Sequence, residues 1–151
     1  MRCFLLLLFT LSLSSYGESA VEVTAWSRAT PPGGTSAAIY GLFTNTGATS
    51  LTLTSVWADF ADQGMIHDSR NHGDMTSMRE GKLEIPASST VELRPGGKHI
   101  MLMGLDKRLL EGCVYSLRLS WSDSSTSMHR FMAGGVAQLI APSFSASDSC
   151  Q

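Results

Sequence analysis

Apolar and polar residues alternate along several short segments of this chain, and this period of two limits the folds that the chain can adopt. Successive side chains of a β-strand point to opposite faces, so alternation indicates a strand with one buried and one solvated face. Turn-forming residues, mainly Gly, Pro and Asn, separate the segments. The segments that we expect to be strands are 21–25, 36–44, 51–54, 91–94, 117–121 and 128–139.

This pattern predicts an all-β fold. About seven or eight short strands at this spacing are typical of a Greek-key sandwich or barrel. Only residues 105–110 have the pattern of a helical turn, and no repeat or second domain is visible. We therefore expect a single domain over residues 18–140. Residues 141–151 are rich in Ser and are expected to form a flexible tail.

The N-terminus has the organisation of a secretory signal peptide. Arg2 precedes an apolar run over residues 4–13, and Ser15 and Gly17 supply the small residues that a signal peptidase reads. Residues 1–17 are the expected signal, with cleavage as late as Ala20 as the alternative. The apolar run is shorter than the roughly 20 residues needed to span a bilayer. The chain is thus expected to be exported to the periplasm and to have no membrane span after signal removal.

Charge and cysteine content narrow the function further. The formal net charge is −2 at pH 7, and no basic stripe is visible, which argues against nucleic-acid binding. Cys3 leaves with the signal and lies too early to be a lipid-attachment cysteine. Cys113 has the strand parity of a buried thiol, but in an oxidising compartment it could instead pair with Cys150.

The segment His99-Ile100-Met101 has the geometry of half a metal site. Residues two apart on a strand share a face, so the imidazole of His99 and the thioether of Met101 can reach one ion from one side. Two further ligands are expected in the polar stretch 67–78, which is predicted to be a hairpin between two strands and contains two His and two Met residues. Two neutral imidazoles with two thioethers form a soft, uncharged site, and such sulfur ligands favour cuprous copper over zinc, calcium or magnesium.

Other His, Met and Cys residues have simpler explanations. Met103, Met128 and Met132 are expected to fill the core, and His129 to be solvated or hydrogen-bonded. An electron-transfer cupredoxin site would need two His, one Cys and a weak axial Met. Cys113, His129 and Met132 have the required types, but fifteen residues separate the Cys from the His. That separation argues against an electron-transfer site. A second alternative function is a β-sandwich domain that has a structural or adhesive role and binds no metal.

Several separated motifs resemble the periplasmic copper chaperones of the PCuAC family. The resemblance extends over residues 21–136, and its motifs occur in the same order as in the family. They are residues 25–33, 40–47, 83–87 and 91–105, together with the His/Met stretch 67–78. It implies a cupredoxin-like β-sandwich that binds Cu(I) and passes it to an acceptor protein, notably for assembly of the copper centre of cytochrome c oxidase. It implies a carrier and not an enzyme.

The resemblance also implies a ligand set. The family's ligand pattern begins with a His, which ten residues separate from a Met. About twenty residues then separate this Met from a His-x-Met segment. Here ten residues separate His67 from Met78, and twenty residues separate Met78 from His99-Ile100-Met101, one fewer than in the family. If the stretch bulges, Met75 could replace Met78, and His72 is expected to be solvated. The expected partner is a cytochrome c oxidase subunit or a di-cysteine chaperone, and the chain is expected to be a monomer.

Overall fold

The computed structural model describes residues 20–72 and 75–143, and all regular structure within them is β-strand. The strands are β1 (Val21–Arg28), β2 (Ser36–Asn45), β3 (Leu51–Trp57), β4 (Ala61–His72), β5 (Met75–Glu80), β6 (Glu84–Ile85), β7 (Ser89–Leu93), β8 (Lys98–Leu105), β9 (Val114–Trp121) and β10 (Thr126–Gly134). The all-β prediction is confirmed. Within these residues no helix is long and apolar enough to cross a bilayer.

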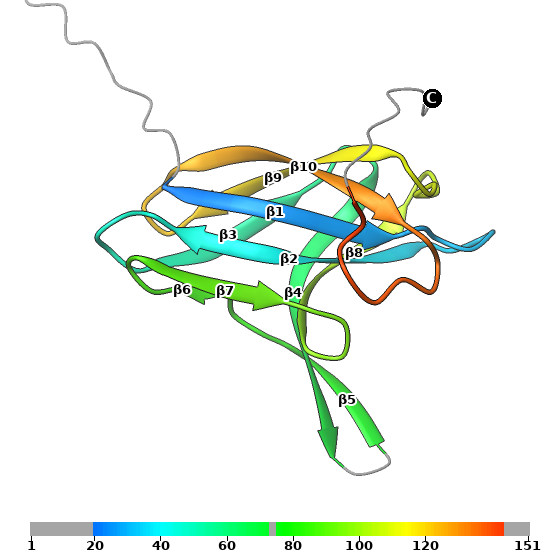
Figure 1. Cartoon of the computed structure of the whole chain (residues 1–151), viewed down its shortest axis with the longest axis horizontal. Coiled ribbons are helices and arrows are strands. Elements are labelled where there is room, and N and C mark those ends of the chain that lie inside the picture. The colour runs from blue at the N-terminus through cyan, green and yellow to red at the C-terminus, as the bar shows by residue number, and fades with distance from the viewer. Residues whose placement is uncertain (1–19, 73–74, 144–151) are drawn as a thin grey trace, which may run out of the picture.

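The strands form a closed barrel with additions at its edges. Around the barrel the order is β4, β8, β2, β1, β10, β9 and β3, and β3 returns to pair with β4. Neighbours are antiparallel except β1 and β10, which run parallel. The short strands β6 and β7 add to β3 and β2, and β5 adds to the outer half of β4 (Figure 1). Because β8 lies between β2 and β4, the connections cross over as in a Greek key.

The barrel interior is filled by apolar side chains from every wall strand. Alternate residues point inward, as the period of two predicts. Aromatic rings supply much of the volume, and those of Phe60, Tyr115 and Phe131 contact one another, with centroids 5.4 to 6.4 Å apart. The largest fully buried side chains are Trp121, Phe43, Phe60, Phe131, Ile39, Leu83, Ile85, Leu93, Ile100, Leu102, Leu109 and Leu117.

Closure of the barrel depends on a glycine. Strands β3 and β4 pair through Val56 and Gly64. A Cβ atom at Gly64 would lie 2.8 Å from Val56 Cγ1 and 2.9 Å from the Val56 carbonyl oxygen. Both distances are shorter than van der Waals contact, so only a residue without a side chain permits this approach. The position matters for function because β4 continues from here into the candidate site.

Strand β4 is part of the barrel wall in its first half and part of a β-hairpin in its outer half. Its first part pairs with β8 as far as Asp68, and its outer part pairs with β5 in a hairpin. We call residues 69–72 and 75–80 the β4–β5 arm. Figure 1 shows this arm extending away from the barrel. The prediction of a hairpin over residues 67–78 is therefore confirmed in its backbone.

Two predictions of local structure are wrong. Residues 105–110 form no helical turn, because Leu109 exchanges hydrogen bonds with Thr30 in another loop: Thr30 N donates to Leu109 O at 2.9 Å, and Leu109 N to Thr30 Oγ1 at 3.0 Å. The last strand ends at Gly134 and does not reach Leu139. A turn follows it, in which Gln138 N donates to Gly135 O at 3.0 Å.

The expectations for the two ends lie largely outside the described residues. The expected signal peptide, residues 1–17, is not described, and of the expected tail only residues 141–143 are. Cys113 is buried and forms a disulfide, which decides between the free thiol and the paired state that the sequence left open. The other two cysteines, Cys3 and Cys150, both lie outside the described residues.

Candidate metal centre

The pairing of β4 with β8 places two of the expected ligands directly opposite each other. His67 pairs with His99, and one step along the same face Met65 pairs with Met101. The residues between them, Ile66 and Ile100, point into the core and are buried. His99 and Met101 were predicted to share one face of their strand, and on β4 His67 and Met65 share a face in the same way. This alternation produces an outward face that carries imidazoles and thioethers.

The two imidazoles lie close enough to share an ion. Their ring centroids are 5.8 Å apart, and the rings are nearly perpendicular, at 80°. His99 is only 5% exposed, and its Nδ1 lies 2.9 Å from the Gly97 carbonyl oxygen. Since a carbonyl only accepts, Nδ1 carries the hydrogen and Nε2 keeps a free lone pair. Metal-binding histidines are commonly oriented by a backbone carbonyl in this way.

His67 has a buried nitrogen with no hydrogen-bond partner. Its Nδ1 is shielded from solvent and has no hydrogen-bond partner among the residues that the structure describes. Leaving such a polar atom unsatisfied costs about 1–3 kcal/mol. An ion bound at Nδ1 itself would relieve that cost. The orphaned nitrogen is therefore an observation from the structure itself that fits a metal-binding role for His67.

An aromatic row supports His99 from the side away from His67. Tyr40 on β2 lies beside His99, with centroids 6.1 Å apart, and Trp26 on β1 lies beside Tyr40 at 4.9 Å. Burial raises the pKa of Tyr40, while the nearby charge of Arg28 acts in the opposite direction. The phenol thus stays neutral at physiological pH. It packs against the imidazole without adding a negative charge to the site.

The two expected sulfur ligands have different surroundings. Met101 is half-buried in the barrel wall. Met78 lies on β5 opposite Ser69, two positions from the residue that faces His67, and its side chain is 60% exposed. One thioether is therefore held by the barrel, and the other is presented on the β4–β5 arm.

The remaining expected His and Met residues lie away from the His67–His99 pair. Met103 was expected in the core, but this expectation is wrong: it is half-buried on the same outward face. It lies opposite Gln63 and Ser36, so it has no imidazole or sulfur donor across either strand. Met132 is buried as expected, whereas Met128 is 56% exposed, so its expected core role is wrong. Met75 pairs with His72 at the far end of the hairpin. The side chains of these last two residues lie outside the described part of the chain.

The residues of an electron-transfer site are not assembled. Cys113 is bonded in a disulfide. His129 pairs with Leu117, four positions from Cys113 along the strand, which corresponds to about 13 Å. Its Nε2 lies 2.7 Å from Ser127 Oγ, so it is hydrogen-bonded as expected. Among the described residues no three or more His, Cys, Asp or Glu side chains gather as a metal-binding group.

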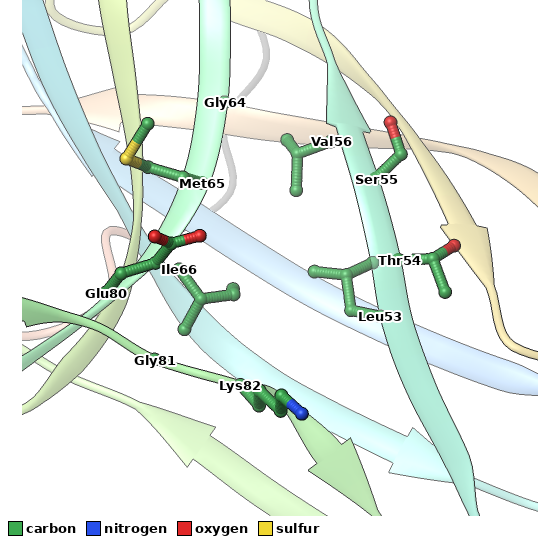
Figure 2. Close-up of a pocket in the computed structure, with 10 residues that line it drawn as sticks. All are labelled: Leu53, Thr54, Ser55, Val56, Gly64, Met65, Ile66, Glu80, Gly81 and Lys82. Carbon is green, nitrogen blue, oxygen red and sulfur yellow. The ribbon is translucent and has the colours of Figure 1, made fainter.

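Met65 was not among the ligands predicted from the sequence. Figure 2 shows its side chain leaving β4 on the side away from Val56 and Leu53, and the carboxylate of Glu80 extends toward the same part of β4. Met65 stands two residues before His67, just as Met101 stands two residues after His99. The same parity argument, applied to both strands, would have found it.

Solved structures of PCuAC domains share this fold. The copper-bound PCuAC domain from PmoF2 superimposes with a TM-score of 0.67 over 80% of this chain and 97% of that one, at 20% identity. At that identity the likeness concerns the fold alone. The structure titled CuI-DR1885, from Deinococcus radiodurans, has a TM-score of 0.62 and 26% identity, covering 80% of each chain. These matches show that the chain has the fold of PCuAC domains.

Sequence comparison gives the family. The chain belongs to the LpqE-like family, described as "Putative lipoprotein LpqE-like", whose profile matches residues 20–131. A relative from Leifsonia xyli, named "Putative lipoprotein Lxx21020", is 38% identical over 105 residues, or 68% of this chain. The match spans 62% of that relative's length.

Proposed function

We propose that this protein is an exported copper chaperone that binds one cuprous ion through His67, Met78, His99 and Met101 and delivers it to an acceptor protein. The observation that carries the proposal is the cross-strand pair of His67 and His99 with Met101 on the same face. The titles of two structural neighbours, one copper-bound and one with Cu(I), support the choice of metal. The lipoprotein names of the relatives and the signal-like N-terminus support export, and we place the protein in the periplasm.

The donor set suits a cargo that must be given up again. Imidazole and thioether ligands are neutral, so they bind a soft monovalent ion without a negatively charged trap. The hydrogen bond from His99 Nδ1 to Gly97 directs Nε2 outward. The cross-strand His67–His99 pair holds the ion on the barrel, and the exposed Met78 is the donor that an incoming acceptor meets first.

Transfer then proceeds by exchange of ligands. The acceptor's thiolates replace the thioethers and then the imidazoles one at a time, and the ion stays cuprous throughout, so no electron is transferred. A di-cysteine protein has the higher affinity for the soft ion, which drives the exchange. We propose that such an acceptor serves assembly of the copper centre of cytochrome c oxidase. The protein acts as a monomeric carrier and catalyses no reaction.

The first experiment measures copper bound under reducing conditions. We expect one ion per chain, with nitrogen and sulfur neighbours in X-ray absorption. His99→Ala should lose most of the copper, because imidazole is the stronger donor. His129→Gln is the matched control, since His129 lies on β10 and is hydrogen-bonded to Ser127. No retained copper, or a shell of oxygens only, would overturn the proposal and favour a structural or adhesive role.

A second experiment tests delivery. Copper-loaded protein is mixed with a reduced di-cysteine acceptor, the two are separated, and metal is assayed in each. Circular dichroism of the donor is recorded in parallel. We expect copper to move while the β signal of the donor is unchanged, and Met78→Ala to retain some copper but release it faster. Copper that stays on the donor, or moves only when the donor unfolds, would indicate storage instead of transfer.

A further inference from the structure

Strands β4 and β8 present four metal-binding side chains in two adjacent cross-strand pairs. His67 pairs with His99, and Met65 pairs with Met101. All four lie on the outward face, because Ile66, Ile100 and Leu102 between and beyond them are buried in the core. Met65 is thus an additional thioether next to the ligands of the proposed function.

Sheet geometry places Met65 closer to the β8 ligands than it places Met78. Directly opposed residues have Cβ atoms about 4.5–5.5 Å apart. Met65 has this relation to Met101 and is a diagonal neighbour of His99, about 7–8 Å away. Met78 lies on β5, one strand further out, so two strand spacings, about 10 Å, separate it from β8. A donor on β4 therefore reaches an ion bound to His99 and Met101 more readily than a donor on β5.

Met65 does not have the position of a core-filling methionine. Its neighbour Gly64 makes the closing contact with Val56, and Ile66 supplies the buried side chain on the core side. Met65 itself is half-buried, and Figure 2 shows it directed away from Val56 and Leu53. A flexible thioether in this place can swing toward the imidazoles by rotation of its side chain alone.

We propose that Met65 is a reserve copper ligand that takes the place of Met78 when the arm engages the acceptor. This inference rests on the proposed function. In the exchange the bond from Met65 sulfur to the ion forms as the bond from Met78 sulfur breaks, and no proton or electron is transferred. The ion keeps two imidazole and two thioether neighbours, now all from β4 and β8. The arm is thereby freed without exposing a two- or three-coordinate ion to solvent.

The test uses Met→Leu substitutions, which remove sulfur and nearly conserve volume. Four proteins are compared: wild type, Met78→Leu, the double variant Met65→Leu/Met78→Leu, and the control Met78→Leu/Met103→Leu. Met103 is the matched control because it lies on the same face but has no imidazole or sulfur donor opposite it. Cu(I) affinity is measured by competition with a chromogenic cuprous chelator, and sulfur neighbours are counted by X-ray absorption.

We expect Met78→Leu and the control double variant to keep two sulfur neighbours. Met65→Leu/Met78→Leu should retain only one and bind Cu(I) on the order of tenfold more weakly than Met78→Leu. The sulfur count of Met78→Leu is decisive by itself, so the proposal stays testable if a double variant does not fold. A single sulfur neighbour in Met78→Leu would overturn the role of Met65 but not the proposed function. Equal Cu(I) affinity of Met78→Leu and Met65→Leu/Met78→Leu would have the same meaning. Absence of copper from the wild type would instead overturn the proposed function.

Discussion

Substitution of Gly64 by Ala should weaken the barrel at the point where it closes. The added Cβ would lie 2.8 Å from Val56 Cγ1, 2.9 Å from Val56 Cβ and 2.9 Å from the Val56 carbonyl oxygen. Ordinary contacts begin near 3.4 Å, so about half an ångström must be gained against both a side chain and a backbone atom. Overpacking of this kind costs about 1–3 kcal/mol. Reduced freedom of the unfolded chain returns about 0.4–1 kcal/mol.

The two terms together give a net loss between about 0 and 2.6 kcal/mol in the free energy of unfolding, with a midpoint of about 1.3 kcal/mol. In thermal unfolding the midpoint corresponds to a decrease of roughly 3–5 °C in Tm for a domain of this size. Urea denaturation followed by circular dichroism measures the free energy directly. An unchanged slope with denaturant would show that the native state, and not the compactness of the unfolded chain, is affected.

Gly81→Ala is the matched control. Neither glycine has a positive φ, but a Cβ at Gly81 meets only ordinary contacts, at 3.4 Å and beyond. Its stability should change by no more than about 1 kcal/mol, in the stabilising direction. Val56→Ala combined with Gly64→Ala removes the Cγ1 contact, so the two changes should couple favourably by about 0.5 kcal/mol or more. If Gly64→Ala is as stable as Gly81→Ala, β3 and β4 do not approach as closely as described.

Three further outcomes are expected. Asn45→Ala should lower the free energy of unfolding by about 2–4 kcal/mol, because buried Asn45 donates to Thr49 O at 2.7 Å and Ile85 O at 3.0 Å; a loss under about 1 kcal/mol in urea denaturation would contradict this. Burial lowers the pKa of His129 below its ordinary value of 6.5, so the unfolded chain binds the proton more readily and stability should fall as the pH drops below that value. His129→Gln should reduce this fall, and an equally steep fall in the variant would refute the assignment. Met101→Ala should weaken Cu(I) retention far more than Met103→Ala on desalting, and equal losses would show that the face is assigned wrongly.

The alternation in the sequence was sufficient to predict most of the barrel wall. Segments such as 21–25 and 117–121 show it clearly because one face of each strand packs on the core and the other is solvated. The last strand was predicted too long because the pattern does not distinguish a strand from an apolar turn held by its own hydrogen bonds. At Gly135 and Gln138 such bonds end the strand.

The site could be predicted only in part, for a related reason. Parity within one strand relates His99 to Met101, but the partner of a strand is fixed by tertiary packing and not by local sequence. The pairing of His67 with His99 links residues more than thirty positions apart, so the sequence could not show it without the resemblance to a family. Met65 was overlooked because that resemblance directed attention to Met78, while the register of β4 against β8 brings the other sulfur to the face.

The β4–β5 arm has a consequence for hydrogen exchange. Beyond Ser69 the arm's backbone pairs only with itself, and an isolated two-stranded hairpin is marginally stable in water. Amide protons of β5 should therefore exchange through local opening, while those of Ile66 and Ile100 should exchange only when the barrel unfolds. A metal ion bridging Met78 to the two histidines would add a cross-link between these regions. Copper occupancy could then be read from the protection of β5 amides, residue by residue, without observing the metal.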